Sequence, residues 1–241
     1  MKNKFSLNLE TQISADDLTK ILTKYEPWGH KIDFSNGVST TNFKRRIPFN
    51  ENPLQKVKIV EQKIPFEQFC GGNILDIGCN SGYNSIYLAS KYQMQPTGID
   101  VTFRHIEVSR LLSEIANIEA NYIIENAETY SKENNFDVVL HFVTLYHLPN
   151  PLLSLQTTYN NLKPGGYLAL ETQVYDHPND PNICYFMYLQ NNDKTNFWAL
   201  STYVLKKYLE IIGFLEIQEL LKVSPALLAE NMSRIILIAK K

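Results

Sequence analysis

The sequence predicts an α/β fold in which helices flank a mostly parallel sheet of seven strands. Two strand candidates, Asn73–Ile77 and Phe136–Phe142, are apolar on both faces, as strands buried in a parallel sheet usually are. Helical stretches such as Tyr83–Tyr92 and Phe103–Ile115 alternate with the strand candidates. Because strands that alternate with helices pair through right-handed crossovers, we expect one continuous parallel sheet.

The other elements complete this alternation. Ser14 is a suitable N-cap for a helix at 15–25, and the sequence KPGG at 163–166 predicts a chain-reversing turn. A hairpin is expected around 224–231, where the last two strands meet. Strands are further expected at 97–100, 121–125, 167–171, 214–220 and 233–239, and helices at 54–69, 151–162 and 202–212.

Two segments fall outside the alternation and predict cap elements. Residues 1–50 combine a short helix with a stretch rich in turn formers and aromatic residues, and we interpret them as an N-terminal cap over the substrate. Residues 173–201 have no helical or strand period and are too long for an idle connection. We therefore expect a lid at 173–201, inserted in a main domain that spans 51–241.

The composition is that of an ordinary soluble domain. Lys and Arg total 23 against 25 Asp and Glu, and this balance argues against a large nucleic-acid interface. The basic run Lys44-Arg45-Arg46 is interpreted as a solvated face. The three cysteines have no metal-ligand spacing, and no apolar run is long enough to span a bilayer. We expect a cytoplasmic protein without a metal site or membrane contact.

The strongest local signal is the turn after the strand at Asn73–Ile77. Gly78 and Gly82 let the backbone turn tightly into a helix and let a ligand lie against the main chain. The pattern D-x-G-x-x-x-G differs from the dinucleotide fingerprint, and Asp76 stands where it would repel a pyrophosphate. A positively charged ligand fits this turn, as the methionyl amine and sulfonium of S-adenosylmethionine (SAM) do.

Polar residues at the ends of the next two strands extend this site. Asp100 has the spacing at which an acid accepts hydrogen bonds from ribose hydroxyls in nucleotide-binding folds. Asn126 follows the third strand, where its amide can pair with the adenine edge. The predicted cofactor-binding residues are Asp76, Gly78, Cys79, Asn80, Gly82, Asp100, Val101, Asn126, Ala127 and Phe142.

These motifs resemble class I SAM-dependent methyltransferases, which have a Rossmann-like fold. The resemblance rests on ILDIGCNSGYNS, the GID that follows it and LKPGGYLALET, and it covers residues 71–240. A narrower resemblance, to the family that includes the tRNA wobble-uridine carboxymethyltransferase, rests on Pro27-Trp28, on TLYHLPNP at 144–151 and on Ser233-Arg234. The resemblance implies SAM as the cofactor and leaves the substrate open.

One departure from the narrower family concerns the form of the cofactor. In the tRNA enzyme, a Lys two residues after the Trp helps to hold the carboxylate of carboxy-SAM, whereas this chain has His30 there. The tRNA enzyme also has a longer N-terminal region and an additional basic surface. These differences favour ordinary SAM and an acceptor other than tRNA.

The acceptor side is expected after the fourth strand. The predicted catalytic residues are His147, Tyr146 and Glu171. An imidazole at His147 can take a proton from a hydroxyl acceptor near pH 7. An equally good interpretation is that Tyr146 packs over the cofactor while His147 only holds the loop. Glu171 is expected either to orient the acceptor or to anchor a loop, and His141 is expected to pack inside its strand. The predicted substrate-binding residues, whose alternative role is a cap core, are Trp28, His30, Tyr185, Tyr188 and Trp198.

The sequence alone leaves three functions open. The first is methylation of an oxygen or nitrogen of a small molecule or peptide, with a hydroxyl or carboxylate as the acceptor group, by a monomer or homodimer. The second is tRNA wobble-uridine modification. The third is a non-catalytic SAM-binding partner subunit, against which the intact Asp76, Gly78, Gly82 and Asp100 argue.

Overall fold

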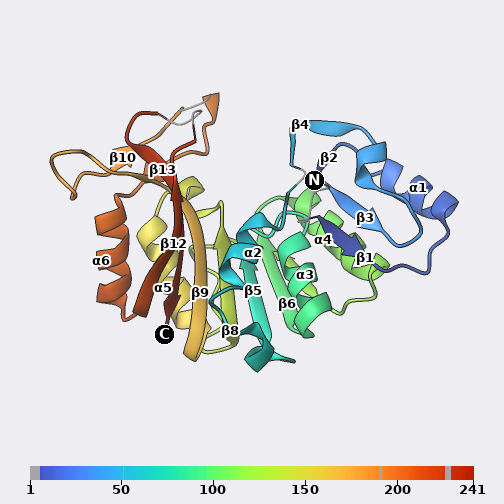
Figure 1. Ribbon diagram of the computed structural model, residues 1–241, viewed down its shortest axis with the longest axis horizontal. Coiled ribbons are helices and arrows are strands. Elements are labelled where there is room, and N and C mark those ends of the chain that lie inside the picture. The colour runs from blue at the N-terminus through green and yellow to red at the C-terminus, as the bar shows by residue number, and fades with distance from the viewer. Residues whose placement is uncertain (1–5, 51, 190–191, 226–228) are drawn as a thin grey trace.

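A computed structural model describes residues 6–50, 52–189, 192–225 and 229–241 (Figure 1). A seven-stranded sheet with helices on both faces forms its centre, which confirms the predicted fold class. Every neighbouring pair from β9 to β7 is parallel, and β13 is antiparallel to both of its neighbours, β12 and β9. In spatial order the strands are β12 (Leu215–Val223), β13 (Met232–Lys240), β9 (Leu162–Tyr175), β8 (Phe136–Phe142), β5 (Asn73–Ile77), β6 (Gln95–Asp100) and β7 (Asn121–Ile124).

Alternate residues of the central strands supply the two faces of the core. On β5, Leu75 and Ile77 pack on the face that is covered by α5 (Pro151–Asn161) and α6 (Thr202–Ile212). Ile74 packs on the other face, with residues of α2 (Gln55–Val60) and α3 (Tyr83–Tyr92). This division follows from the two-residue period of a strand, and it explains why these strands are apolar throughout.

The order of the strands places a crevice at one edge of the sheet. From β5 the chain passes through α3 to β6 and through α4 (Phe103–Ile115) to β7, and then returns to form β8 on the other side of β5. Ligands of open α/β sheets bind at such a reversal of strand order, beside the carboxyl ends of the strands. The glycine-containing turn after β5 lies at this point.

The N-terminal segment adds two small sheets beside α4. β1 (Leu7–Leu9) pairs with β3 (Ile32–Phe34), and β2 (Trp28–His30) pairs with β4 (Arg45–Asn50). Between β1 and β2 in the chain, α1 (Ala15–Thr23) begins at the predicted N-cap, where the hydroxyl of Ser14 accepts a hydrogen bond from the Asp17 N–H. Leu18, Leu22 and Ile32 pack in one cluster with Ile106 and Leu112 of α4. The segment therefore shares a core with the sheet domain.

Three predicted boundaries are wrong. The helix expected at 54–69 ends at Val60, and a separate 3₁₀ turn forms at Phe66–Phe69. Pro65 keeps the two apart, because proline disfavours helical geometry in the residue before it, here Ile64. The turn expected at 163–166 lies inside β9, where the pairing with β8 shifts register. Residues 173–175 belong to β9 as well, since β13 offers them an antiparallel partner.

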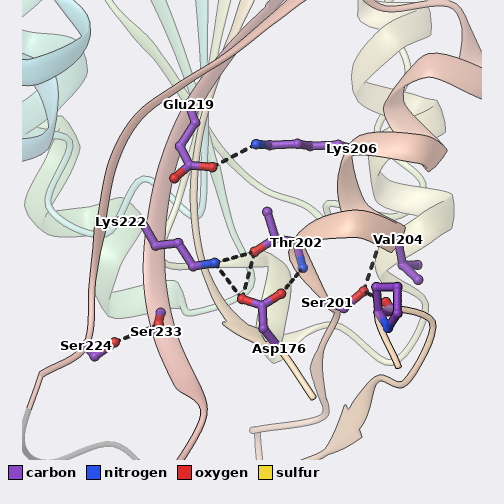
Figure 2. Close-up of polar contacts among 10 residues, drawn as sticks. Asp176, Ser201, Thr202, Val204, Lys206, Glu219, Lys222, Ser224 and Ser233 are labelled. Atoms are coloured by element: carbon purple, nitrogen blue, oxygen red, sulfur yellow. Dashed lines mark hydrogen bonds and ion pairs between the residues drawn. The ribbon is translucent and has the colours of Figure 1, made fainter. Parts of the chain in front are cut away.

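The segment that we expect to act as a lid therefore comprises residues 176–201, of which 190 and 191 lie outside the described residues, and we keep the name lid for it. It contains a two-stranded ribbon, β10 (Tyr185–Phe186) with β11 (Trp198–Ala199). Its two ends meet at the sheet, as Figure 2 shows. There the Asp176 carboxylate accepts hydrogen bonds from the Thr202 N–H at 2.9 Å, the Thr202 hydroxyl at 3.0 Å and the Lys222 ammonium at 2.6 Å.

The expected hairpin joins β12 to β13, although residues 226–228 of its loop lie outside the described residues. Among the helices of the described chain, none has the length and apolar character that crossing a membrane requires.

Candidate cofactor and acceptor site

A cavity of about 540 Å³ opens at the carboxyl ends of β5, β6 and β8. Its walls come from the sheet edge, from the N-terminal segment, from α2 and from the lid. Its size lies within the roughly 300–1,000 Å³ that is usual for small-molecule sites. The cavity is lined by His30, Lys56, Asp76, Gly78, Cys79, Asn80, Tyr83, Asn84, Ile99, Asp100, Val101, Thr102, His105, Glu125, Ala127, Phe142, Val143, Thr144, His147, Leu148 and Thr195.

The turn after β5 brings the backbone close to this cavity. Gly78 and Gly82 both have φ near +70°, a conformation that side chains rarely adopt. A Cβ on Gly78 would overlap the Thr144 side chain, and a Cβ on Gly82 would lie 2.7 Å from the Tyr122 hydroxyl. Glycine is therefore required at both positions for the turn itself, and Gly78 lines the cavity.

Asp76 supplies a buried carboxylate oxygen without a partner. Its side chain is 2% exposed, and its Oδ2 has no hydrogen bond. Burial raises the pKa of this carboxyl to about 7; hydrogen bonding to Ser85 opposes this rise, and the neighbouring Asp100 adds to it. A cation bound beside Asp76 would satisfy the orphaned oxygen and stabilise the ionised form.

Asp100 is held in place by the chain around it. Its carboxylate accepts hydrogen bonds from the Asn80 N–H at 3.1 Å and the Thr102 N–H at 2.8 Å, and His105 Nδ1 lies 3.1 Å away. Burial would raise its pKa, but these partners, His105 first, hold the pKa below its usual value. Asp100 is therefore an ionised acceptor at the end of β6.

The order of the strands separates two parts of the cavity. Asp76, Asp100 and Glu125 lie on the β5–β6–β7 side, and we call this part the acidic end. His147 follows β8 on the other side, and both His147 and Lys56 interact electrostatically with Arg234. His30 interacts with Lys56 and also with His105, which lies beside Asp100. We call His30, Lys56 and His147 the histidine end, which His30 joins to the acidic end.

His147 is held with one ring nitrogen free. Its Nδ1 lies 3.1 Å from the backbone oxygen of Thr195 in the lid. The Thr195 hydroxyl lies 3.0 Å from the same Nδ1, but it donates to Asp193 Oδ1 at 2.7 Å and so accepts from the ring. Because both Thr195 oxygens accept, Nδ1 carries the proton, and Nε2 is left as the basic nitrogen. Burial lowers the pKa of His147, so the imidazole is neutral at pH 7. This tautomer suits a proton acceptor.

The other two members of the histidine end come from segments that are distant in the sequence. Burial lowers the pKa of His30 to about 4, and Lys56 acts in the same direction, so this ring too is neutral at pH 7. The His30 ring lies 4.3 Å from the Tyr83 ring, between their centroids. Burial also lowers the pKa of Lys56.

Glu171 and Tyr146 lie behind the histidine end. The Glu171 carboxylate accepts two hydrogen bonds from Arg234, at 2.5 and 2.9 Å. The Arg234 guanidinium also lies over the Tyr146 ring, 5.4 Å from its centroid. Tyr146 is buried against Met187 and Met232. Neither Tyr146 nor Glu171 lines the cavity, and their catalytic roles remain predictions.

The other predicted residues divide between the cavity and its surroundings. Of the cofactor set, only Gly82 and Asn126 lie outside the cavity lining. Of the substrate set, His30 lines it, whereas Trp28 lines an adjacent hollow of about 40 Å³. Trp198 donates a hydrogen bond from Nε1 to the Pro149 oxygen, at 3.2 Å.

Tyr185 and Tyr188 are exposed on the lid. Their contact with a substrate remains a prediction. His141 is buried, as expected, with its Nε2 3.0 Å from the Ser154 hydroxyl.

Sequence reasoning missed several lining residues. Glu125, Thr102 and His105 are close in the sequence to predicted positions. Asn84 lies inside the motif ILDIGCNSGYNS, but the motif alone assigns it no role. Lys56 lies in no motif, and only the folded chain brings Lys56 and Thr195 to the cavity. Among the described residues, no group of three or more His, Cys, Asp or Glu side chains is placed to hold a metal ion.

The cavity fits SAM. The orphaned Asp76 oxygen suits the methionyl ammonium, the turn at Gly78 lines the cavity with main chain, and Asp100 presents an ionised acceptor to ribose hydroxyls. All three features lie in one cavity of suitable volume.

Comparison with known proteins agrees with this fit. Residues 51–219 match the family described as "Methyltransferase domain". The chain is 35% identical over 104 residues to a ubiquinone biosynthesis O-methyltransferase of Shewanella pealeana, covering 42% of this chain and 44% of that protein. It is 34% identical over 184 residues to a tRNA U34 carboxymethyltransferase of Desulfotalea psychrophila, covering 70% and 54%. The chain thus spans about half the length of these curated relatives.

Solved structures share the fold. The N-terminal domain of EvdMO1, crystallised in the presence of S-adenosylhomocysteine (SAH) and D-fucose, superposes with a TM-score of 0.71 at 17% identity, covering 95% of this chain and 97% of that one. Phosphoethanolamine N-methyltransferase 2 of Haemonchus contortus, in complex with SAM, gives a TM-score of 0.64 at 17% identity, covering 79% and 53%. With the family match over more than half of its length, the chain belongs to the methyltransferase domain family, in the class I, SAM-dependent fold.

Proposed function

We propose that the protein transfers the methyl group of SAM to an oxygen or nitrogen of a small molecule. The observation that carries the proposal is the division of one cavity into an acidic end, suited to the cofactor, and a histidine end with a free imidazole nitrogen. The EvdMO1 domain, crystallised with SAH and D-fucose, supports a small acceptor, since the two chains share nearly their whole extent.

Each residue has a defined task in this proposal. SAM supplies an electrophilic methyl group on its sulfonium. Asp76 binds the methionyl ammonium and Asp100 the ribose hydroxyls, which fixes the direction of the methyl group. His147 Nε2 takes the proton of an acceptor hydroxyl or amine, while Nδ1–H stays bonded to Thr195.

Lys56 favours an acidic oxygen as the nucleophile. An ammonium beside the acceptor stabilises a phenolate or carboxylate more than a neutral group. Neutral His30 and His147 leave Lys56 as the cation of the histidine end. Glu171 and Arg234 neutralise each other behind it.

Transfer of tritium from methyl-labelled SAM tests this proposal. The purified protein is incubated with a small-metabolite extract and, separately, with bulk tRNA. The proposal expects label in the metabolite fraction. Label in tRNA alone would contradict it, and a His147→Ala preparation shows whether any label depends on this site.

A second candidate is modification of tRNA, and it is favoured by the match to the tRNA U34 carboxymethyltransferase over 70% of this chain. The cofactor's form separates the two candidates. With His30 in place of the expected Lys, we propose that the protein does not prefer carboxy-SAM. Competition between SAM and carboxy-SAM measures this, and a preference of about tenfold or more, equal to 1.4 kcal/mol, would favour the tRNA candidate.

A further inference from the structure

Asn84 is a second buried acceptor in the cavity. It is the second residue of α3, it is 8% exposed, and its Oδ1 has no hydrogen bond. It lines the same cavity as Asp76, on the opposite side of the glycine-containing turn in the chain. Leaving a buried polar atom unpaired is costly for the folded protein. Such an atom inside a ligand cavity therefore calls for a partner.

The helix does not supply that partner. Polar residues near a helix start usually bond the free backbone groups there. No side chain caps α3, because Gly82 occupies the N-cap position. Tyr83 and Ser85, on either side of Asn84, are engaged with the protein: the Tyr83 ring contacts His30, and the Ser85 hydroxyl donates to the Gly82 oxygen at 3.0 Å.

Asp76 and Asn84 together match one chemical group. Among the cavity-lining residues of the described chain, they carry the orphaned buried oxygens. Two acceptors suit an ammonium, which has three N–H donors. The Asn84 side chain carries its amide oxygen and its NH₂ donor on one carbon. An amino-acid head group likewise carries an ammonium donor and a carboxylate acceptor on one carbon.

We propose that Asn84 works with Asp76 to bind the amino-acid head group of the methionyl part of SAM, its Oδ1 accepting from the ammonium. This inference rests on the proposed cofactor. Asn84 then selects cofactors that carry the head group over adenosine compounds that lack it. Asp100, by contrast, serves any ligand with the same ribose.

The test compares two ligands by isothermal titration calorimetry. SAH has the head group, and 5′-methylthioadenosine has the same adenosine and sulfur without it. In Asn84→Ala, we expect the dissociation constant of SAH to rise by about 10–100-fold, as loss of hydrogen bonds to a charged group implies. That of 5′-methylthioadenosine should change by less than about threefold, which also shows that the variant is folded.

Thr158→Val is the matched control. Thr158 is buried in α5, and its hydroxyl lacks a partner too, but it does not line the cavity. It should leave the binding of both ligands unchanged. Unchanged SAH binding by Asn84→Ala, or an equal loss for both ligands, would overturn the inference. Failure of the wild-type protein to bind either ligand would instead contradict the proposed cofactor.

Discussion

The two ends of the cavity are built in different ways. The acidic end comes from the ends of β5, β6 and β7, neighbouring strands whose carboxyl ends meet by the rules of parallel sheets. The histidine end comes from four separate segments: His30 of the N-terminal segment, Lys56 of α2, His147 after β8, and Thr195 of the lid, which holds His147. The first end follows from the fold. The second depends on how appended segments pack on it, so it is the part that can differ between relatives of the same fold.

The largest expected effect lies at the histidine end. If His147 is the base, His147→Ala lowers kcat by about 10²–10⁴, the usual worth of a positioned base, while the dissociation constant of SAH stays within about twofold. His177→Ala, a lid histidine outside the cavity lining, is the control and should keep nearly full kcat. Once an acceptor is known, steady-state kinetics measure both variants. Nearly full kcat in His147→Ala would refute the base role and indicate an acceptor that is already ionised.

At the acidic end, Asp76→Asn should weaken SAH binding by about 10–150-fold, which corresponds to 1.5–3 kcal/mol for a charged hydrogen bond. It should also stabilise the ligand-free protein at neutral pH. The pKa of Asp76 is about 7 in the folded protein, above its value in the unfolded chain. The folded state therefore becomes less stable as the pH rises from the unfolded pKa to the folded one, because the unfolded chain loses this proton first. Thermal unfolding without ligand measures the gain in stability of Asp76→Asn. A variant that loses both stability and affinity for SAH would contradict the raised pKa of Asp76.

The same pKa predicts a pH dependence of binding. The ammonium of SAH prefers ionised Asp76, so its dissociation constant should rise as the pH falls below about 7 in the wild type. Asp76→Asn should lack this dependence. Titrations between pH 5.5 and about 8 compare the two proteins, and parallel curves would show that Asp76 does not meet the ammonium.

Asp100→Ala sharpens the division within the acidic end. Loss of the Asp100 carboxylate should weaken the binding of SAH and of 5′-methylthioadenosine alike, by up to about 3 kcal/mol, because both ligands carry the ribose. Asp33→Ala, in β3 and outside the cavity lining, serves as the control. An effect confined to SAH would move Asp100 from the ribose to the head group.

The smallest effect is expected at the base of the lid. Asp176→Ala removes the acceptor that joins Thr202 and Lys222, and it should lower the free energy of unfolding by about 1 kcal/mol, since the group is partly exposed. Because its bonds hold the pKa of Asp176 below the usual value against the effect of burial, this stabilisation exists above the unfolded pKa and disappears as the pH falls. Glu219→Ala, which removes the nearby pair with Lys206, should cost less than about 0.5 kcal/mol. Chemical denaturation measures both, and equal losses would show that the lid base has no special role.

The acidic end could be predicted from the sequence more fully than the histidine end. The order of strands and helices and the positions of Asp76, Gly78 and Asp100 were predictable, because each depends on neighbours in the chain and on the period of a buried strand. The three-residue strands β1, β2 and β3 carry too short a pattern to detect. Lys56 and Thr195 reach the cavity only through tertiary packing, and the extent of β9 depends on pairing with β13, which lies far along the chain.

A crystal structure of the protein with SAH would locate both ends of the cavity in one measurement. We expect the amino-acid head group beside Asp76 and Asn84, the ribose hydroxyls on the Asp100 carboxylate, and the sulfur directed toward His147 Nε2 across the space left for the acceptor. A structure in which the ribose lies away from Asp100, or in which the sulfur points away from the histidine end, would contradict the division of the cavity into a cofactor end and an acceptor end.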